Sequence, residues 1–211
     1  MVSSNLSGKI QTVLGPMEPD ELGITMTHEH LLIDFRCVYE EPAEAGKKGL
    51  AYAPLSLENL GWIRYNWTSN LDNLTLFDED TAVAEVSRYK QAGGKSLVDA
   101  TNIGIGRDPE GLARIARATG VNIIMGAGYY VGSTHRHDMD QKTTEQIAYE
   151  ITRDITEGVD HTGVRSGIIG ELGCSWPLTD NERKVVRAGV MAQQRTGAPL
   201  WIHPGRDQEA P

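Results

Sequence analysis

The stretch Ile24-Thr25-Met26-Thr27-His28-Glu29-His30-Leu31-Leu32-Ile33-Asp34 sets a His-x-His pair between two apolar runs. Residues two apart on a β-strand point to the same face, so His28 and His30 should project side by side while Glu29 faces away. Two imidazoles on one rigid strand face form a natural half of a metal site. The alternative is a pair of polar side chains on a half-exposed strand. The flanking apolar runs instead predict a buried strand, in which two histidines need partners.

The composition is that of an ordinary globular protein, with 39% hydrophobic and 23% charged residues among 211. We predict one domain over residues 1–211. The net charge of −9 argues against nucleic acid or an anionic membrane as main partner, because both require a basic face. No apolar run approaches the roughly 20 residues of a membrane span. The two cysteines make no disulfide framework, and the N-terminus lacks an apolar signal core, so we predict a cytoplasmic location.

A regular alternation of helices and strands follows residue 78. The helices begin at capping residues and end at glycines, whereas the strands are short apolar runs. The predicted helices cover residues 78–92, 108–118, 143–157 and 179–195, and the predicted strands cover residues 95–101, 121–128, 167–173 and 198–203. Apolar strands alternating with helices indicate parallel βα units. With the His-x-His strand counted first, five strands fit either an open doubly wound sheet or part of a closed (β/α)₈ barrel.

The unusual polar residues lie at the carboxyl ends of these strands. Glu171 ends the fourth strand and His203 ends the fifth, while His28 and His30 lie in the later half of the first. In a barrel, these positions meet at one mouth. Three imidazoles and a carboxylate suit Zn²⁺ or a similar ion. Taken singly, Glu171 could instead pair with a basic residue, and His203 could be a helix cap or a core histidine.

The segments QTVLG, LGITMTHEHLL, GIGRD, GIIGELG and IHPGR resemble the phosphotriesterase-related proteins of the amidohydrolase superfamily, from about Lys9 to Pro211. The resemblance implies a (β/α)₈ barrel with two divalent metal ions, Zn²⁺ or alternatively Mn²⁺. It implies that His28 and His30 bind the more buried metal, that Glu171 bridges both metals, and that His203 binds the outer one.

The sequence departs from this family in one respect. The family uses a further histidine from strand six and an aspartate from strand eight, the proton acceptor for the bridging water, whereas this chain ends at Pro211 just after strand five. We therefore name no catalytic residue in it. We expect a fragment with about five of the eight strands, which neither folds stably nor turns over substrate by itself.

The activity implied by the resemblance is metal-dependent hydrolysis. A hydroxide shared between the metals would cleave the amide of a small acylated amino acid or taurine conjugate, with N-acetyltaurine as the most concrete candidate. Ester, lactone or phosphotriester cleavage at the same site is the alternative within this class. A candidate of another class is a catalytically inactive interaction module that pairs its exposed strand edge with a full-length copy, and a homo-oligomer is compatible with both.

Two residues are candidates for substrate binding. Tyr130 follows the third strand at the predicted mouth, where it could donate a hydrogen bond to substrate or serve only as a rim aromatic. Arg206 lies in the loop after the fifth strand, and its guanidinium suits a sulfonate or carboxylate. The alternative for Arg206 is an ordinary surface arginine.

The remaining histidines and aromatic residues considered are predicted to have structural roles. His135 and His137 form a second His-x-His pair, but their polar neighbours predict a solvated loop and not a pair of metal ligands. Trp62 and Trp67 are interpreted as packing residues.

Overall fold

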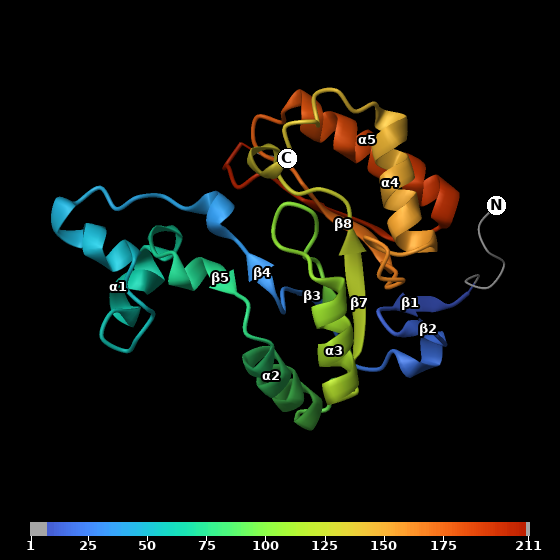
Figure 1. Cartoon of the computed structure of the whole chain (residues 1–211), viewed down its shortest axis with the longest axis horizontal. Helices are drawn as coiled ribbons and strands as arrows, with labels where there is room; N and C mark the ends of the chain where they lie inside the picture. The colour runs from blue at the N-terminus through green and yellow to red at the C-terminus, as the bar shows by residue number, and fades with distance from the viewer. Residues whose placement is uncertain (1–7, 210–211) are drawn as a thin grey trace.

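The computed structural model describes residues 8–209 and centres on a five-stranded parallel sheet (Figure 1). The prediction that the N-terminus lacks a signal core concerns residues 1–7, which lie outside the described residues. The strands, neighbours in chain order, are β3 (Thr25–Glu29), β6 (Ser96–Asp99), β7 (Asn122–Ala127), β8 (Ile168–Gly173) and β9 (Leu200–His203). A doubly wound sheet reverses its strand order part-way, whereas this sheet keeps the sequential order expected for part of a barrel.

Four long helices follow the predicted positions. They are α2 (Glu79–Gln91), α3 (Pro109–Thr119), α4 (Thr144–Thr156) and α5 (Asp180–Thr196). The side chains of Asp78, Asp108, Thr143 and Thr179 each accept a hydrogen bond from the backbone N–H three residues later, which satisfies a free donor of the first turn. The helix ending at Gly197 has φ 73° there, a left-handed conformation that favours glycine.

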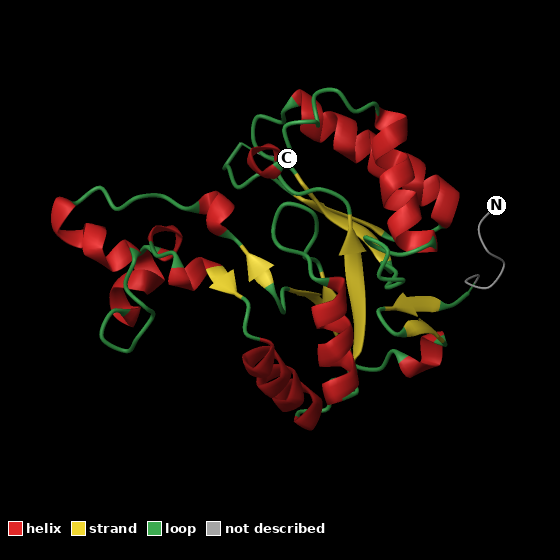
Figure 2. Ribbon diagram, in the orientation of Figure 1, coloured by secondary structure: helices red, strands yellow, loops and turns green. Residues whose placement is uncertain are grey.

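The helices cover one face of the sheet in two pairs (Figure 2). Leu97, Ile123 and Met125 pack with residues of α2 and α3 in one core. Ile169 and Leu172 pack with residues of α4 and α5 in a second core. The opposite face carries Val98, Ile124 and Ile168, against which Ile10, Leu22 and Trp201 pack. The sheet is therefore apolar on both faces, as parallel sheets usually are.

A two-stranded hairpin closes the amino-terminal side of the sheet. It consists of β1 (Ile10–Thr12) and β2 (Gly15–Met17), which pair antiparallel. The Val13 backbone N–H donates to the Ile123 carbonyl over 2.8 Å and ties the hairpin to β7. The hairpin therefore forms a small sheet separate from the five-stranded one.

Residues 33–76 form an arm that projects from the body of the molecule (Figure 1). Its two ends pair antiparallel as β4 (Ile33–Asp34) and β5 (Thr75–Leu76). The arm holds α1 (Leu60–Tyr65) and the short 3₁₀ helices Arg36–Val38, Ala45–Ala51, Trp67–Ser69 and Asp72–Leu74. Two further 3₁₀ helices, Pro19–Glu21 and Gly132–Thr134, lie outside it. The arm is therefore built mainly of short helical turns.

The His-x-His stretch differs from the prediction in two ways. It is not one strand: β3 ends at Glu29, because the Leu31 N–H donates to the Asp99 carboxylate over 2.7 Å and the chain turns away into β4. It is also not buried, since Ile24 is 65% and Met26 37% exposed. Among the described residues, β3 pairs only with β6, so it is an edge strand.

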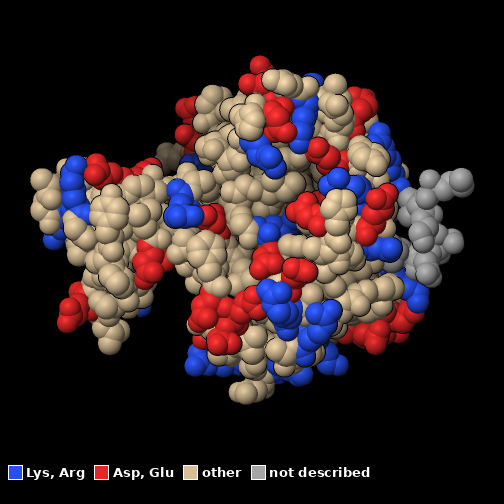
Figure 3. All heavy atoms as spheres, in the orientation of Figure 1, with Lys and Arg blue, Asp and Glu red and all other residues tan. Residues whose placement is uncertain are grey.

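Charged side chains of both signs are interspersed over the face of the molecule shown in Figure 3. Within residues 8–209, no helix combines the length and the apolar character needed to cross a bilayer.

Candidate metal centre

Glu171 on β8 is surrounded by three imidazoles. Its side chain is only 3% exposed, and its Oε2 lies 3.2 Å from His28 Nε2 and 3.0 Å from His203 Nδ1. Its Oε1 lies 3.5 Å from His30 Nε2. Two strands separate β3 from β8, and a flat sheet would hold them roughly 14 Å apart. The contact between them shows that the sheet curls and carries these side chains on its concave side.

Within residues 8–209, the only possible ion-pair partners of the Glu171 carboxylate are these three imidazoles. Burial by itself raises the pKa of a carboxyl, but the hydrogen bond to His203 and the charges of His28 and His30 outweigh it. The pKa of Glu171 therefore lies below its ordinary value. A buried, ionised carboxylate with no lysine or arginine beside it favours a bound cation.

His30 is held in an orientation that directs one ring nitrogen to Glu171. Its Nδ1 lies 3.0 Å from Thr101 Oγ1, which leaves Nε2 for the carboxylate side. Burial, opposed by Glu171, lowers the pKa of His30 to about 4, so the ring is neutral near pH 7, as a metal ligand must be. Asp99 and Thr101 were not singled out from the sequence, although two polar residues ending the run KSLVDAT could have indicated them.

The donor set fits a divalent cation. One ligand atom from each of His28, His30 and Glu171 lies within 4.8 Å of the others. Neutral imidazoles and a carboxylate are ligands that zinc and similar borderline ions accept. His203 is not part of this three-residue group. Its Nδ1 faces Glu171, and its Nε2 lies 3.3 Å from the hydroxyl of Tyr130.

A cavity of about 390 Å³, here called the histidine pocket, opens above these residues. Its wall includes all six residues singled out from the sequence as metal ligands or substrate contacts: His28, His30, Tyr130, Glu171, His203 and Arg206. Its apolar part is formed by Ile33, Phe35, Leu74 and Leu76. Burial raises the pKa of Tyr130 well above its ordinary value, so its hydroxyl keeps its proton and can donate.

Residues 8–211 match the family model described as the phosphotriesterase family. The chain belongs to the phosphotriesterase family. It is 48% identical to the N-acetyltaurine hydrolases of Salmo salar and Xenopus tropicalis, each match covering 99% of this chain and 60% of the relative. A resiniferatoxin-binding protein from Rhodobacter sphaeroides has a similar structure, with a TM-score of 0.92 and 45% identity over 93% of this chain and 55% of that one.

This phosphotriesterase-family chain thus spans about 60% of the length of the curated relatives it matches. Family membership predicted from THEH, GIIGELG and IHPGR is confirmed. The role of each individual site residue stays a prediction.

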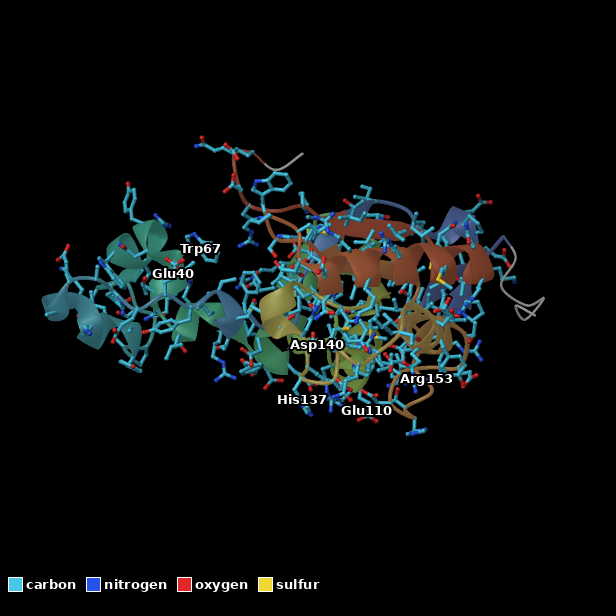
Figure 4. All side chains as sticks on the ribbon, turned by 90° about the horizontal axis from the view of Figure 1, so that it is seen from above. Glu40, Trp67, Glu110, His137, Asp140 and Arg153 are labelled. Carbon is cyan, nitrogen blue, oxygen red and sulfur yellow. The ribbon has the colours of Figure 1, made fainter. Side chains whose placement is uncertain are left out.

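His135 and His137, the second His-x-His pair of this family member, do not line the histidine pocket. His137 is exposed, as predicted for a loop, and Figure 4 shows it at the periphery of the body. His135 is not simply solvated: its Nε2 lies 2.8 Å from the Tyr130 carbonyl oxygen, and its ring meets Tyr129 edge-on at 6.2 Å. The polar residues around His135 in the sequence did not predict these contacts, because they depend on how the loop folds back onto the end of β7.

Two aromatic residues of the arm contact Arg206, and the sequence did not predict their position. Phe35 stacks on Trp67 with ring centroids 6.2 Å apart and planes 15° apart. The Arg206 guanidinium lies over both rings. Trp67 was interpreted as a packing residue, yet it is 43% exposed and lies at the end of the arm nearest the body (Figure 4).

Proposed function

We propose that this chain carries the metal-binding part of a hydrolase that cleaves the amide bond of a small N-acylated amino acid or taurine conjugate. N-acetyltaurine is the first substrate to test. The observation that carries this proposal is the buried Glu171 carboxylate among three imidazoles at the carboxyl ends of parallel strands. The names of the N-acetyltaurine hydrolases at 48% identity support the substrate class. The activity is proposed for the whole protein, because the chain spans only part of its relatives.

The proposed centre holds two divalent ions, Zn²⁺ in the first instance and Mn²⁺ as the alternative. His28 and His30 would bind one ion, Glu171 would bridge both, and His203 would bind the other. Such ions, when bound, activate water and polarise a carbonyl oxygen. The five strands would then belong to a (β/α)₈ barrel, which the sequential strand order and the curl between β3 and β8 support.

The residues of the chain contribute binding and orientation. Tyr130 keeps its proton and can donate to an oxygen of the substrate. Arg206 borders the same pocket and offers a permanent positive charge to a sulfonate or carboxylate. Ile33, Leu74 and Leu76 provide an apolar surface for a short acyl group. An anionic N-acyl compound therefore fits the hydroxyl donor, the positive charge and the apolar surface of the pocket.

The test is hydrolysis of N-acetyltaurine by the purified protein, expressed in the longest form that its gene encodes and supplied with Zn²⁺. Proton NMR would follow released acetate, which should appear together with an equal amount of taurine. The variant Glu171→Ala should show no release. Normal kcat in that variant with metal bound would refute the proposed bridge. The ester, lactone and phosphotriester alternatives are examined by offering those substrates in the same assay.

A second candidate, an inactive interaction module, is favoured by the exposed edge of β3. Ile24 and Met26 there are exposed, and an unpaired edge can accept another strand. Size-exclusion chromatography of the chain mixed with a longer form would test this, and absence of a complex would count against it. The single domain, the cytoplasmic location and the homo-oligomer stay predictions.

A further inference from the structure

Arg206 is held by two stacked rings that come from a distant part of the chain. Its guanidinium carbon lies 5.3 Å from the centre of the Phe35 ring and 5.5 Å from that of the Trp67 ring. Both distances fall within the roughly 6 Å over which a cation is attracted to an aromatic face. More than 130 residues of sequence separate Arg206 from either ring, so the folded arm creates this contact.

The guanidinium is oriented but not neutralised. Among the described residues, no carboxylate lies within ion-pair distance of Arg206, and Asp34, which precedes Phe35 on the arm, pairs with Arg36. Stacking uses the face of a guanidinium and leaves its in-plane N–H donors free. Arg206 borders both the histidine pocket and an adjoining cavity of about 350 Å³ that also contains Ser175 and Trp176. An unpaired cation that lies over two aromatic rings at this shared wall is suited to bind an anionic group.

The same ring connects Arg206 to the metal centre. Phe35 lies 5.9 Å from Tyr130, and Tyr130 lies 5.1 Å from His203, measured between ring centroids. The backbone of Phe35 is itself fixed, because its N–H donates to the Leu74 carbonyl over 2.7 Å. A change of the Phe35 side chain would therefore act on the orientation of Arg206 more than on the position of the arm.

We propose that Phe35 and Trp67 are positioning residues that hold the Arg206 guanidinium at the pocket wall and thereby determine the preference for substrates with an anionic group. This inference rests on the proposed function for its substrate class. It assigns the arm a role in specificity, whereas hydrolysis itself depends on the histidine and glutamate side chains.

The test compares two ligands of nearly equal shape by isothermal titration calorimetry of the Zn²⁺-loaded protein. Both are ketones in which a CH₂ group replaces the amide N–H, so that no turnover occurs. One is the sulfonate 4-oxopentane-1-sulfonate, and the other is its neutral sulfone analogue, 5-(methylsulfonyl)pentan-2-one. The wild-type full chain should bind the sulfonate at least about tenfold more tightly. Phe35→Leu and Trp67→Leu should each reduce that ratio about fivefold, without weakening the binding of the sulfone.

Three further variants test whether the preference depends on the Arg206 charge and on an aromatic ring at position 67. Arg206→Met should bring the ratio close to one. Trp67→Phe keeps an aromatic face and should restore most of the preference. Tyr65→Leu removes a ring that is 91% exposed on the same arm and should leave the ratio unchanged. Circular dichroism of each variant confirms that it is folded.

An unchanged ratio in both Phe35→Leu and Trp67→Leu would overturn the inference, even if Arg206→Met abolished the preference. A wild-type ratio near one would also overturn it. The predicted ratios for the two ketones, together with no cleavage of N-acetyltaurine in the presence of Zn²⁺, would instead refute the proposed function and leave this inference standing.

Discussion

The Nδ1 atom of His203 lies 3.0 Å from Oε2 of Glu171, and the register of two parallel strands places it there. Gly173 on β8 is the direct partner of His203 on β9, and Glu171 precedes Gly173 by two positions. Residues two apart share a face of a strand, so both side chains point to the concave side of the sheet. A shift of one residue in this pairing would remove the contact.

Tyr130 should contribute to substrate turnover without a large effect on folding. Its hydroxyl lies 3.3 Å from His203 Nε2, and burial keeps the phenol protonated by raising its pKa. We expect Tyr130→Phe to lower kcat/KM for N-acetyltaurine about ten- to a hundredfold, the value of one strong hydrogen bond. Tyr129→Phe is the matched control, because the Tyr129 hydroxyl donates to Glu150 away from the histidine pocket. Equal losses in both variants would contradict the role of Tyr130.

The pKa of His30 predicts how the metal-free protein responds to acid. The unfolded ring takes up a proton near pH 6.5, whereas burial delays protonation in the folded protein until about pH 4. Falling pH therefore favours the unfolded state across this interval, by up to about 3 kcal/mol. His30→Asn should lose correspondingly less stability between pH 6.5 and 4.5 in urea titrations.

The comparison with His30→Asn is needed because Asp99 acts in the opposite direction. Burial raises the pKa of Asp99 to about 6, so the folded protein holds this proton at a pH where the unfolded chain has lost it. The Asp99 contribution therefore becomes more favourable as pH falls from about 6 to 4. The Asp99 contribution is the same in the wild type and in His30→Asn, so it cancels when the two pH profiles of the free energy of unfolding are subtracted. Parallel pH profiles for the two proteins would contradict the lowered pKa of His30.

Glu182 should be essential for stability beside the adjoining cavity, which its partner Ser175 lines. Its fully buried carboxylate accepts hydrogen bonds from the Gly132 N–H over 2.7 Å, the Thr179 N–H over 2.8 Å and the Ser175 hydroxyl over 2.5 Å. We expect Glu182→Gln to lower the free energy of unfolding by about 2–4 kcal/mol, because an amide nitrogen cannot accept from these donors. Exposed Glu145→Gln, in the first turn of α4, should change it by less than about 1 kcal/mol. A loss below 1 kcal/mol in Glu182→Gln would show that the network is replaceable.

Local sequence signals were sufficient to predict most of the helices and strands. Capping residues such as Thr143 and Thr179, with glycines after the helices, located the helices to within a few residues. Glu171 and His203 could be predicted to meet because both end apolar strands, and parallel strands end on one side of a sheet. The choice between doubly wound sheet and barrel needed the strand order, which periodicity does not contain.

The remaining features depend on tertiary contacts. The break after Glu29 arises from a hydrogen bond between Leu31 and Asp99, which are 68 residues apart. The exposure of Met26 reflects its edge position, which an apolar run does not reveal. The stacking of Phe35 and Trp67 beneath Arg206 requires the fold of the whole arm, and no residue pattern within the arm specifies its partner.

The most direct test of the metal centre is the Zn²⁺ content per chain after equilibrium dialysis, measured by elemental analysis. The wild-type protein should retain Zn²⁺, and Glu171→Gln should lose it, because the buried charge that attracts the cation is removed. Glu29→Gln lies between the two histidines but outside the ligand group and should retain the wild-type content. Equal Zn²⁺ content in wild type and Glu171→Gln, or none in the folded wild-type protein, would contradict the proposed centre.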